Sequence, residues 1–167
     1  MSFSIIAAIG KNNELGKNNG LCFQLKGDMK YFRETTKGHK VLMGSRTFAS
    51  LPKLLPGRTH IVISSRMKDE DFPEGVIHYA TIEDVLKDFS PSDNSEEIFV
   101  IGGGMIYAEM LPYSSKLYLT EVDAEDREAD TFFKEFNKDD YKREVIGSGE
   151  DEGIKYDFVV YSRKESL

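Results

Sequence analysis

Three consecutive glycines, Gly102 to Gly104, follow directly on the apolar segment 97–101. The residues after them favour a helix, so the pattern predicts a buried strand that turns tightly into a helix. Glycine leaves room for an anionic ligand against the backbone, and the N–H groups that begin a helix attract such a ligand. A nucleotide-like ligand is the first hypothesis, and a tight turn without a ligand is the alternative. The match to the dinucleotide fingerprint is partial, because Tyr107 stands where its third glycine belongs.

The composition limits the class of protein. A chain of 167 residues with 40% hydrophobic residues predicts one folded domain, residues 1–167. The single cysteine, Cys22, excludes an internal disulfide and favours a reducing cytoplasm, and no metal-ligand spacing is found. A net charge of −7 argues against a nucleic-acid surface. No apolar run reaches the length of a membrane span, and the first residues do not resemble a signal peptide.

Short apolar segments bounded by turn formers predict the strands. These strands are residues 3–9, 40–44, 59–65, 76–80, 97–101 and 116–122. Helices are expected from Asp28 to before Gly38, over 45–51, over 82–89 with a capping box from Thr81, and after the three glycines. Residues 90–95 are expected to form a polar loop, and residues 123–130 an acidic one.

The last third of the chain is rich in predicted strands. Residues 141–146 and 156–163 alternate around Gly147-Ser148-Gly149, which predicts an antiparallel pair that turns at these glycines. The expected fold class is α/β: a single domain with a mostly parallel central sheet of about eight strands, an antiparallel C-terminal hairpin edge and about four flanking helices. Ligands of such sheets bind at the carboxyl ends of the strands.

Two features of the first forty residues suggest a site. The stretch Gly16-Lys17-Asn18-Asn19-Gly20 is rich in turn formers and predicts the start of a loop of about a dozen residues that acts as a lid. Asp28 is the one carboxylate placed like a functional group, because it begins an otherwise apolar helix face. A first-turn partner of the helix dipole or a helix cap is the alternative for Asp28.

An ordered set of motifs extends over essentially the whole chain. The motifs are Ile6-Ala7-Ala8-Ile9, Leu15-Gly16, 25–32, 41–44, Thr47-Phe48, 54–58, 61–65, 101–107 and 117–120. In this order and spacing they resemble the dihydrofolate reductases. The resemblance implies the dihydrofolate reductase fold and NADPH-dependent hydride transfer to C6 of 7,8-dihydrofolate, with protonation at N5, which gives tetrahydrofolate. It also implies a monomer that binds no nucleic acid and no membrane.

The resemblance assigns roles on the substrate side. It implies three catalytic residues: Asp28, which pairs with N3 and the 2-amino group of the pterin, Thr120, which orients Asp28, and Phe23, which covers the ring. Arg58 would capture the α-carboxylate of the glutamate tail with its planar fork, and a plain surface arginine is the alternative. The implied substrate-binding residues are Ile6, Ala7, Asp28, Met29, Phe32, Leu51, Leu55, Arg58, Ile101 and Thr120. Core packing is the alternative for the apolar members of this set.

The resemblance also assigns the cofactor side. It implies that the three glycines cradle the pyrophosphate of NADPH, with a cis peptide bond between Gly102 and Gly103. Arg46, Ser64, Ser65 and Arg66 would receive the 2′-phosphate. The implied cofactor-binding residues are Ala8, Leu15, Gly16, Asn19, Leu21, Gly44, Ser45, Arg46, Thr47, Ser64, Ser65, Arg66, Ile101, Gly102, Gly103, Gly104, Met105, Ile106 and Tyr107.

The chain departs from the family pattern at several positions. Ser45 stands where an arginine is usual, so Arg46 or Arg66 would compensate. Cys22-Phe23 replaces a proline and a tryptophan, which removes a rigid residue and an indole donor from the lid. Met105 replaces a residue that is often basic, and Ala129 lies where a glycine is common.

Two rival functions remain. A related reductase of another pterin or of a ribosylated pyrimidine would not need Asp28 together with Arg58. A non-catalytic nucleotide-binding module would keep the glycine turn and would tolerate a filled pterin pocket, which the small apolar lining around Ile6 and Ala7 disfavours.

Overall fold

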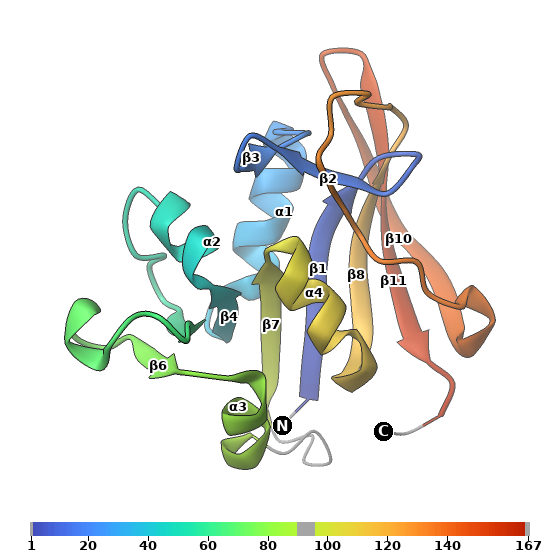
Figure 1. Ribbon diagram of the computed structural model, residues 1–167. Coiled ribbons are helices and arrows are strands. Elements are labelled where there is room, and N and C mark those ends of the chain that lie inside the picture. Colours follow the sequence, from blue (N-terminus) through green and yellow to red (C-terminus); the bar gives the residue numbers. More distant parts are fainter. Residues whose placement is uncertain (1, 90–95, 166–167) are drawn as a thin grey trace.

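The centre of the molecule is an eight-stranded sheet (Figure 1). The structure, a computed structural model, describes residues 2–89 and 96–165, so the predicted loop 90–95 lies outside the described residues. The strand order is β10-β11-β8-β1-β7-β4-β5-β6. These strands are β1 (Ser2–Ile9), β4 (Lys40–Gly44), β5 (Thr59–Ile63), β6 (Ile77–Tyr79), β7 (Glu97–Gly102), β8 (Ser114–Val122), β10 (Tyr141–Asp151) and β11 (Ile154–Arg163).

The pairing of the strands confirms the predicted fold class. The six strands from β8 to β6 pair in parallel, whereas β11 runs antiparallel to both β8 and β10. The described residues contain the α-helices α1 (Lys26–Thr36), α2 (Ser45–Ser50), α3 (Ile82–Asp88) and α4 (Gly104–Met110). Short 3-10 helices occupy Asp69–Asp71, Leu111–Tyr113 and Lys138–Asp140. No described helix is both long enough and apolar enough to span a lipid bilayer.

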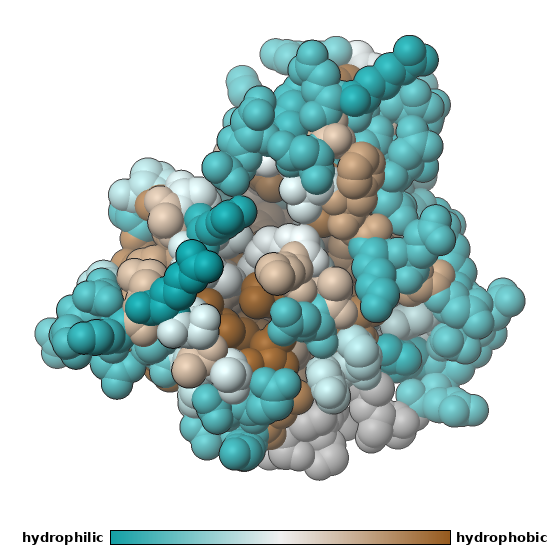
Figure 2. Space-filling view, viewed as in Figure 1, coloured by the Kyte–Doolittle hydropathy of each residue, from teal (hydrophilic) through white to brown (hydrophobic). Residues whose placement is uncertain are grey.

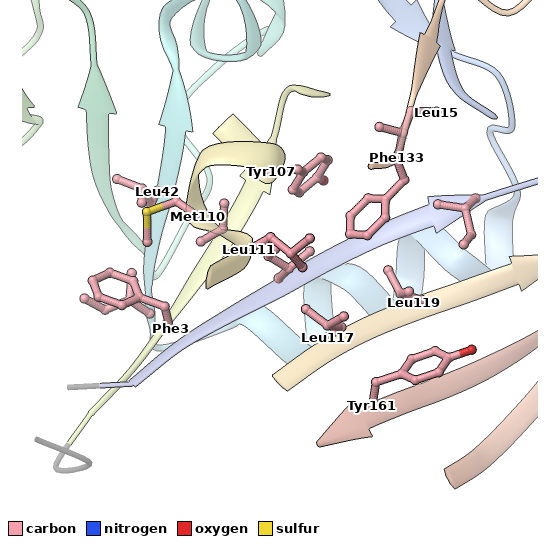
Figure 3. Packing of buried hydrophobic residues seen from close by; sticks show 14 of the residues in the cluster. Phe3, Leu15, Leu42, Tyr107, Met110, Leu111, Leu117, Leu119, Phe133 and Tyr161 are labelled. Carbon is pink, nitrogen blue, oxygen red and sulfur yellow. The ribbon is translucent and has the colours of Figure 1, made fainter. Parts of the chain in front are cut away.

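Side chains of the central strands alternate between two apolar layers, because successive residues of a strand point to opposite faces. Phe3 and Leu42 pack with Tyr107 and Met110 of α4 on one face, which α3 also covers (Figure 3). Ile6 packs on the other face, with side chains of α1 and α2. Helices therefore cover both faces of the sheet, as predicted for a mostly parallel arrangement.

The segment predicted as an open lid loop forms a small sheet instead. Strands β2 (Glu14–Lys17) and β3 (Gly20–Leu21) make a hairpin, and β9 (Thr131–Phe132) pairs with β2. Asn18 and Asn19 both have positive φ, 50° and 64°, which is the conformation of a two-residue hairpin turn that asparagine tolerates. The Asn-Asn pair is therefore the turn of a hairpin and not the start of a long loop.

The prediction of a turn at Gly147-Ser148-Gly149 was wrong. β10 continues through these residues to Asp151, and the chain reverses at Glu152 and Gly153, whose φ values are 51° and 81°. A side chain at Gly149 would lie 2.6 Å from the Tyr156 ring on the neighbouring strand. Gly149 is thus required by a close cross-strand contact and does not mark a change of direction.

Candidate active site

The carboxyl ends of the parallel strands bring the predicted site residues to one edge of the sheet. Gly44 ends β4, Ser64 follows β5 and Gly102 ends β7, while Ile9 ends β1 close to the β2–β3 hairpin. Hydrophilic residues cover most of the molecular face that carries α4, and hydrophobic residues gather beside that helix (Figure 2). The two helices of the opposite face, α1 and α2, contribute Asp28, Met29, Phe32, Ser45, Arg46 and Thr47.

Asp28 lies in the first turn of α1, which begins at Lys26 and not at Asp28 as predicted. Its Oδ1 atom accepts a hydrogen bond of 2.5 Å from the hydroxyl of Thr120 on β8. Burial raises the pKa of Asp28 above its ordinary value, and the hydrogen bond from Thr120 lowers it in part. Within the described residues Oδ2 has no hydrogen-bond partner, so this half-buried carboxylate keeps an acceptor for a ligand.

Four of the predicted apolar substrate-binding residues pack together on the face of the sheet that α1 covers. Ile6, Phe32, Leu51 and Ile101 belong to one cluster, which also contains Phe99. Met29, beside Asp28 on α1, is 45% exposed. Ala7 packs against the opposite layer, so its side chain is directed away from this cluster.

Leu55 is half-buried and is held through its main chain. Its N–H donates a 3.0 Å hydrogen bond to Nε2 of His60. Burial and the charge of Arg58 lower the pKa of His60, which keeps the ring neutral so that Nε2 can accept.

Phe23 is buried in a third cluster and contacts Ala8 there, together with Val122 and Tyr156. Cys22 packs at the edge of the same cluster, and burial raises the pKa of its thiol. The phenyl ring covers the end of β1, but it lacks the hydrogen-bond donor that an indole would bring.

The glycines form a narrow cradle beside α2. The peptide bond between Gly102 and Gly103 is cis, as the resemblance implied. A Cβ atom at Gly102 would lie 3.3 Å from the hydroxyl oxygen of Thr47, and one at Gly103 would lie 3.5 Å from it. Gly102 also has a φ of 135°, which L side chains rarely adopt, so the position needs glycine.

Other predicted cofactor residues surround this cradle. A Cβ atom at Gly44 would lie 3.1 Å from Ile106 of α4. Tyr107, whose hydroxyl is buried, donates a 2.7 Å hydrogen bond to the Ile6 carbonyl oxygen and so ties α4 to β1. Ser45, at the start of α2, is half-buried, whereas Met105 is 76% exposed on α4.

The hairpin of β2 and β3 lies over the glycine turn. A Cβ atom at Gly104 would lie 2.6 Å from Cγ2 of Thr131 and 3.9 Å from Leu15. Asp130 binds the hairpin through two hydrogen bonds. Its N–H donates to the carbonyl oxygen of Gly16, and its carboxylate accepts from the Asn18 N–H at 2.9 Å. Asn19 at the tip and Leu21, which is 60% exposed, are the exposed members of the predicted set here.

The predicted phosphate residues lie at the start of the segment after β5. Ser64 is buried, and its hydroxyl oxygen accepts the N–H groups of Arg66 and Met67 at 3.3 and 3.2 Å. Ser65 and Arg66 are exposed on this turn, and Arg46 is exposed on α2. Among residues 2–89 and 96–165 neither arginine takes part in an ion pair, so both guanidinium groups are available to an anion.

The guanidinium of Arg58 is fixed by three acceptors. Nε donates to the hydroxyl of Thr36 at 3.1 Å, Nη1 to the carbonyl of Pro56 at 2.6 Å and Nη2 to the carbonyl of Arg33 at 2.5 Å. Burial and the nearby charge of Arg33 lower the pKa of Arg58. A guanidinium has five N–H groups, so two remain for a carboxylate.

Residues that the sequence analysis did not select also shape this edge. Glu14 of β2 is 2% exposed, and its carboxylate accepts N–H groups from Asn12 and Asp126, each at 2.7 Å. His78 of β6 contacts the Ser64 carbonyl. No local signal marks Glu14 in the sequence, because it stands among polar residues and only Leu15 beside it is apolar.

Comparison with known proteins connects this geometry to a family. A family model described as dihydrofolate reductase matches residues 2–163. The dihydrofolate reductase of Bacillus subtilis is 36% identical over 166 residues, which cover 98% of this chain and 95% of the relative. That of Haemophilus influenzae is 37% identical over 98% of this chain and 100% of its own length. That of Staphylococcus haemolyticus is 34% identical over 98% of this chain and 96% of its own.

Proposed function

The chain belongs to the dihydrofolate reductase family, and we propose that it reduces 7,8-dihydrofolate to 5,6,7,8-tetrahydrofolate with NADPH as the hydride donor. A bound nicotinamide cofactor would supply the hydride that C6 of the substrate accepts, and water would supply the proton at N5. The single observation that carries this proposal is the half-buried Asp28 carboxylate, bonded to Thr120 on one oxygen and available on the other.

Asp28 is the catalytic residue in this proposal. The N3–H and 2-amino groups of a pterin are adjacent donors, and they match the two oxygens of a carboxylate. Thr120 occupies Oδ1 and so fixes the orientation of the carboxylate. Burial raises the pKa of Asp28, so the carboxylate can share a proton with the bound pterin and favours its protonated form. The apolar cluster that contains Ile6 and Phe32 keeps water away from this pair.

The residues of the glycine turn fit a dinucleotide. The Cβ positions at Gly102 and Gly103 stand close to the Thr47 hydroxyl, so a larger residue would fill the space that a pyrophosphate needs. The hairpin of β2 and β3 covers this turn and excludes water from the two rings when they are bound. The protein thus acts mainly by holding two rings face to face in a dry site.

The two remaining N–H groups of Arg58 support recognition of the glutamate tail. The acceptors Thr36, Pro56 and Arg33 hold the guanidinium in a single orientation. A carboxylate binds such a preformed fork with little loss of side-chain entropy. Arg58 therefore selects folates over pterins that lack a glutamate.

The first experiment measures dihydrofolate-dependent oxidation of NADPH from the loss of its absorbance. The wild type should be active, and Asp28→Asn should lose about 10²-fold or more in kcat, in line with the loss of an acid–base group. Glu34→Gln is a matched control, because Glu34 lies exposed on the same helix. No oxidation of NADPH by the wild type in the presence of dihydrofolate would refute the proposal.

A second experiment tests the choice of cofactor. Arg46→Ala and Arg66→Ala should each raise the KM for NADPH and leave the KM for NADH unchanged, because only NADPH carries the 2′-phosphate. Lys53→Ala is an exposed cation outside the predicted set and should change neither KM. Equal KM values of the wild type for NADPH and NADH would contradict the assignment of NADPH.

We also propose that the protein is a monomer in the cytoplasm. The single cysteine, half-buried Cys22, supports a reducing compartment, and the net charge of −7 opposes self-association. Light scattering during gel filtration should give the mass of one chain, and a mass of two chains would contradict the proposal.

A further inference from the structure

His78 of β6 lies beside the turn that we assign to the 2′-phosphate. Its side chain is 9% exposed. Nε2 lies 2.8 Å from the carbonyl oxygen of Ser64, and Nδ1 lies 2.7 Å from Oδ1 of Asp69. The ring of Phe72 lies against it, with centroids 4.9 Å apart and planes at 32°.

These two contacts determine how the imidazole is protonated. A carbonyl oxygen and a carboxylate oxygen are both acceptors, so each ring nitrogen must donate a hydrogen. An imidazole that donates from both nitrogens is the imidazolium cation. The geometry thus places a positive charge on His78, next to the main chain of Ser64.

Ser64 organises the turn that follows it. Its N–H donates a 3.0 Å hydrogen bond to the Tyr79 carbonyl, and its hydroxyl oxygen accepts from Arg66 and Met67. The His78 contact completes the set by occupying the Ser64 carbonyl. If His78 loses its proton from Nε2, this carbonyl loses its donor and the turn loses one of its supports.

The charged groups around His78 come from each neighbouring element. Asp69 and Asp71, in the 3-10 helix before β6, both raise the pKa of His78. Arg66 and Lys68 lie on the turn itself, and His60 lies on the neighbouring strand β5.

On the opposite face of β6, Asp88 of α3 contacts Tyr79 and not His78. Asp88 accepts a hydrogen bond of 2.6 Å from the hydroxyl of Tyr79, which packs with the layer that contains α3. Asp69, whose side chain is 90% exposed, is therefore the main counter-charge of His78 among the described residues.

We propose that His78 is a positioning residue for the cofactor, which holds the Ser64–Met67 turn in its phosphate-binding shape while protonated and so makes the preference for NADPH over NADH dependent on pH. This inference rests on the proposed use of NADPH. Asp69 acts through His78, because its carboxylate stabilises the imidazolium. His78 touches neither the substrate nor the reacting atoms.

The direction of the pH dependence follows from the contacts. The Ser64 carbonyl, as the largest cause, and Asp69 raise the pKa of His78, and burial opposes them. The proton is therefore lost above the ordinary pKa of about 6.5. The preference for NADPH falls as the pH rises through the pKa of His78, by about two- to fivefold, the range of partly exposed charge interactions.

The test compares kcat/KM for NADPH and for NADH between pH 6 and pH 9. The 2′-phosphate itself titrates near pH 6, so the informative quantity is the difference between the wild type and His78→Gln. The ratio of the two kcat/KM values should fall with pH in the wild type, through KM and not kcat, and should be lower and without this step in His78→Gln. Asp69→Asn should move the step to lower pH.

Two controls separate the possible failures. His39→Gln removes another ring that contacts a main-chain carbonyl, that of Glu97, and should leave the ratio unchanged. Parallel pH profiles of the wild type and His78→Gln would overturn the role of His78, while activity with NADPH would leave the proposed function intact. Absence of NADPH-dependent activity in the wild type would instead overturn the proposed function.

A measurement on the wild type keeps the test valid if His78→Gln does not fold. Nitrogen NMR of the histidine rings gives the pKa of His78 with NADP⁺ bound and with NAD⁺ bound. Linkage requires that NADP⁺ raises this pKa more than NAD⁺ does if the proton favours phosphate binding. Equal pKa values with the two probes would overturn the inference.

Discussion

Replacement of Glu14 by glutamine gives a strong test of the packing at the hairpin. The carboxylate accepts one N–H on each oxygen, from Asn12 and from Asp126. Glutamine offers only one oxygen, and its NH₂ group would face the other N–H in a buried position. A buried donor without an acceptor costs about 1–3 kcal/mol. We expect Glu14→Gln to lose about that much in the free energy of unfolding at neutral pH.

The loss should depend on pH in a defined direction. Burial raises the pKa of Glu14, but the N–H groups of Asp126, Glu14 and Asn12 together outweigh it, so the net pKa is lowered. The stabilisation by the carboxylate is therefore present above the unfolded pKa of about 4.3 and is lost as the pH falls through the folded pKa. Urea unfolding of both proteins over a pH series measures the difference.

The matched control is Glu125→Gln, an exposed acid in the loop that Glu14 holds. This variant should have the stability of the wild type within about 0.5 kcal/mol. A difference between the wild type and Glu14→Gln that stays constant on acidification would refute the reasoning, because the carboxylate charge would then contribute nothing.

Three further changes test other contacts. Asp28→Asn should raise the free energy of unfolding at neutral pH, because burial raises the pKa of the carboxyl and so disfavours its charged form in the folded protein. Urea unfolding over a pH series should show this gain disappear as the pH falls through the raised pKa toward the unfolded value of about 3.9. Gly104→Ala should cost about 1–3 kcal/mol in thermal unfolding, since its Cβ would lie 2.6 Å from Thr131, and adding Thr131→Ser should recover most of the loss. Gly27→Ala would place a Cβ 2.0 Å from the Tyr156 hydroxyl, so Tyr156→Phe should relieve it in the double variant, whereas additive losses would contradict that contact.

Much of the fold was predictable because its signals are local. The apolar segments of β1, β4 and β7 end at glycines or turn formers, so their limits differ from the prediction by at most one residue. The reversal at Glu152 and Gly153 was not predictable in the same way, because Gly147 and Gly149 gave a stronger local turn signal. Those glycines are needed because side chains of the neighbouring strand lie close to them. Such a long-range contact cannot be read from the local sequence pattern.

The candidate site was likewise predictable only where its signals are local. Asp28 and Thr120 are 92 residues apart, and composition and spacing contain nothing that pairs them, so the expectation depended on the family resemblance. Glu14 and His78 depend on contacts with main-chain N–H and carbonyl groups. Nearly every residue has these main-chain groups, so the residue type of the partner does not reveal the contact in the sequence.

The place of β11 in the sheet has a consequence for the biosynthesis of the protein. β11 is the last strand of the described chain, yet it lies between β10 and β8 and pairs Phe158 with Thr120. Until residue 163 has emerged from the ribosome, β8 remains an unpaired edge that can associate with other chains. The strand that carries Thr120, the hydrogen-bond donor to Asp28, therefore gains its second neighbour only after β11 has been synthesised, so ligands that bind at this edge can protect the folded protein but not the growing chain.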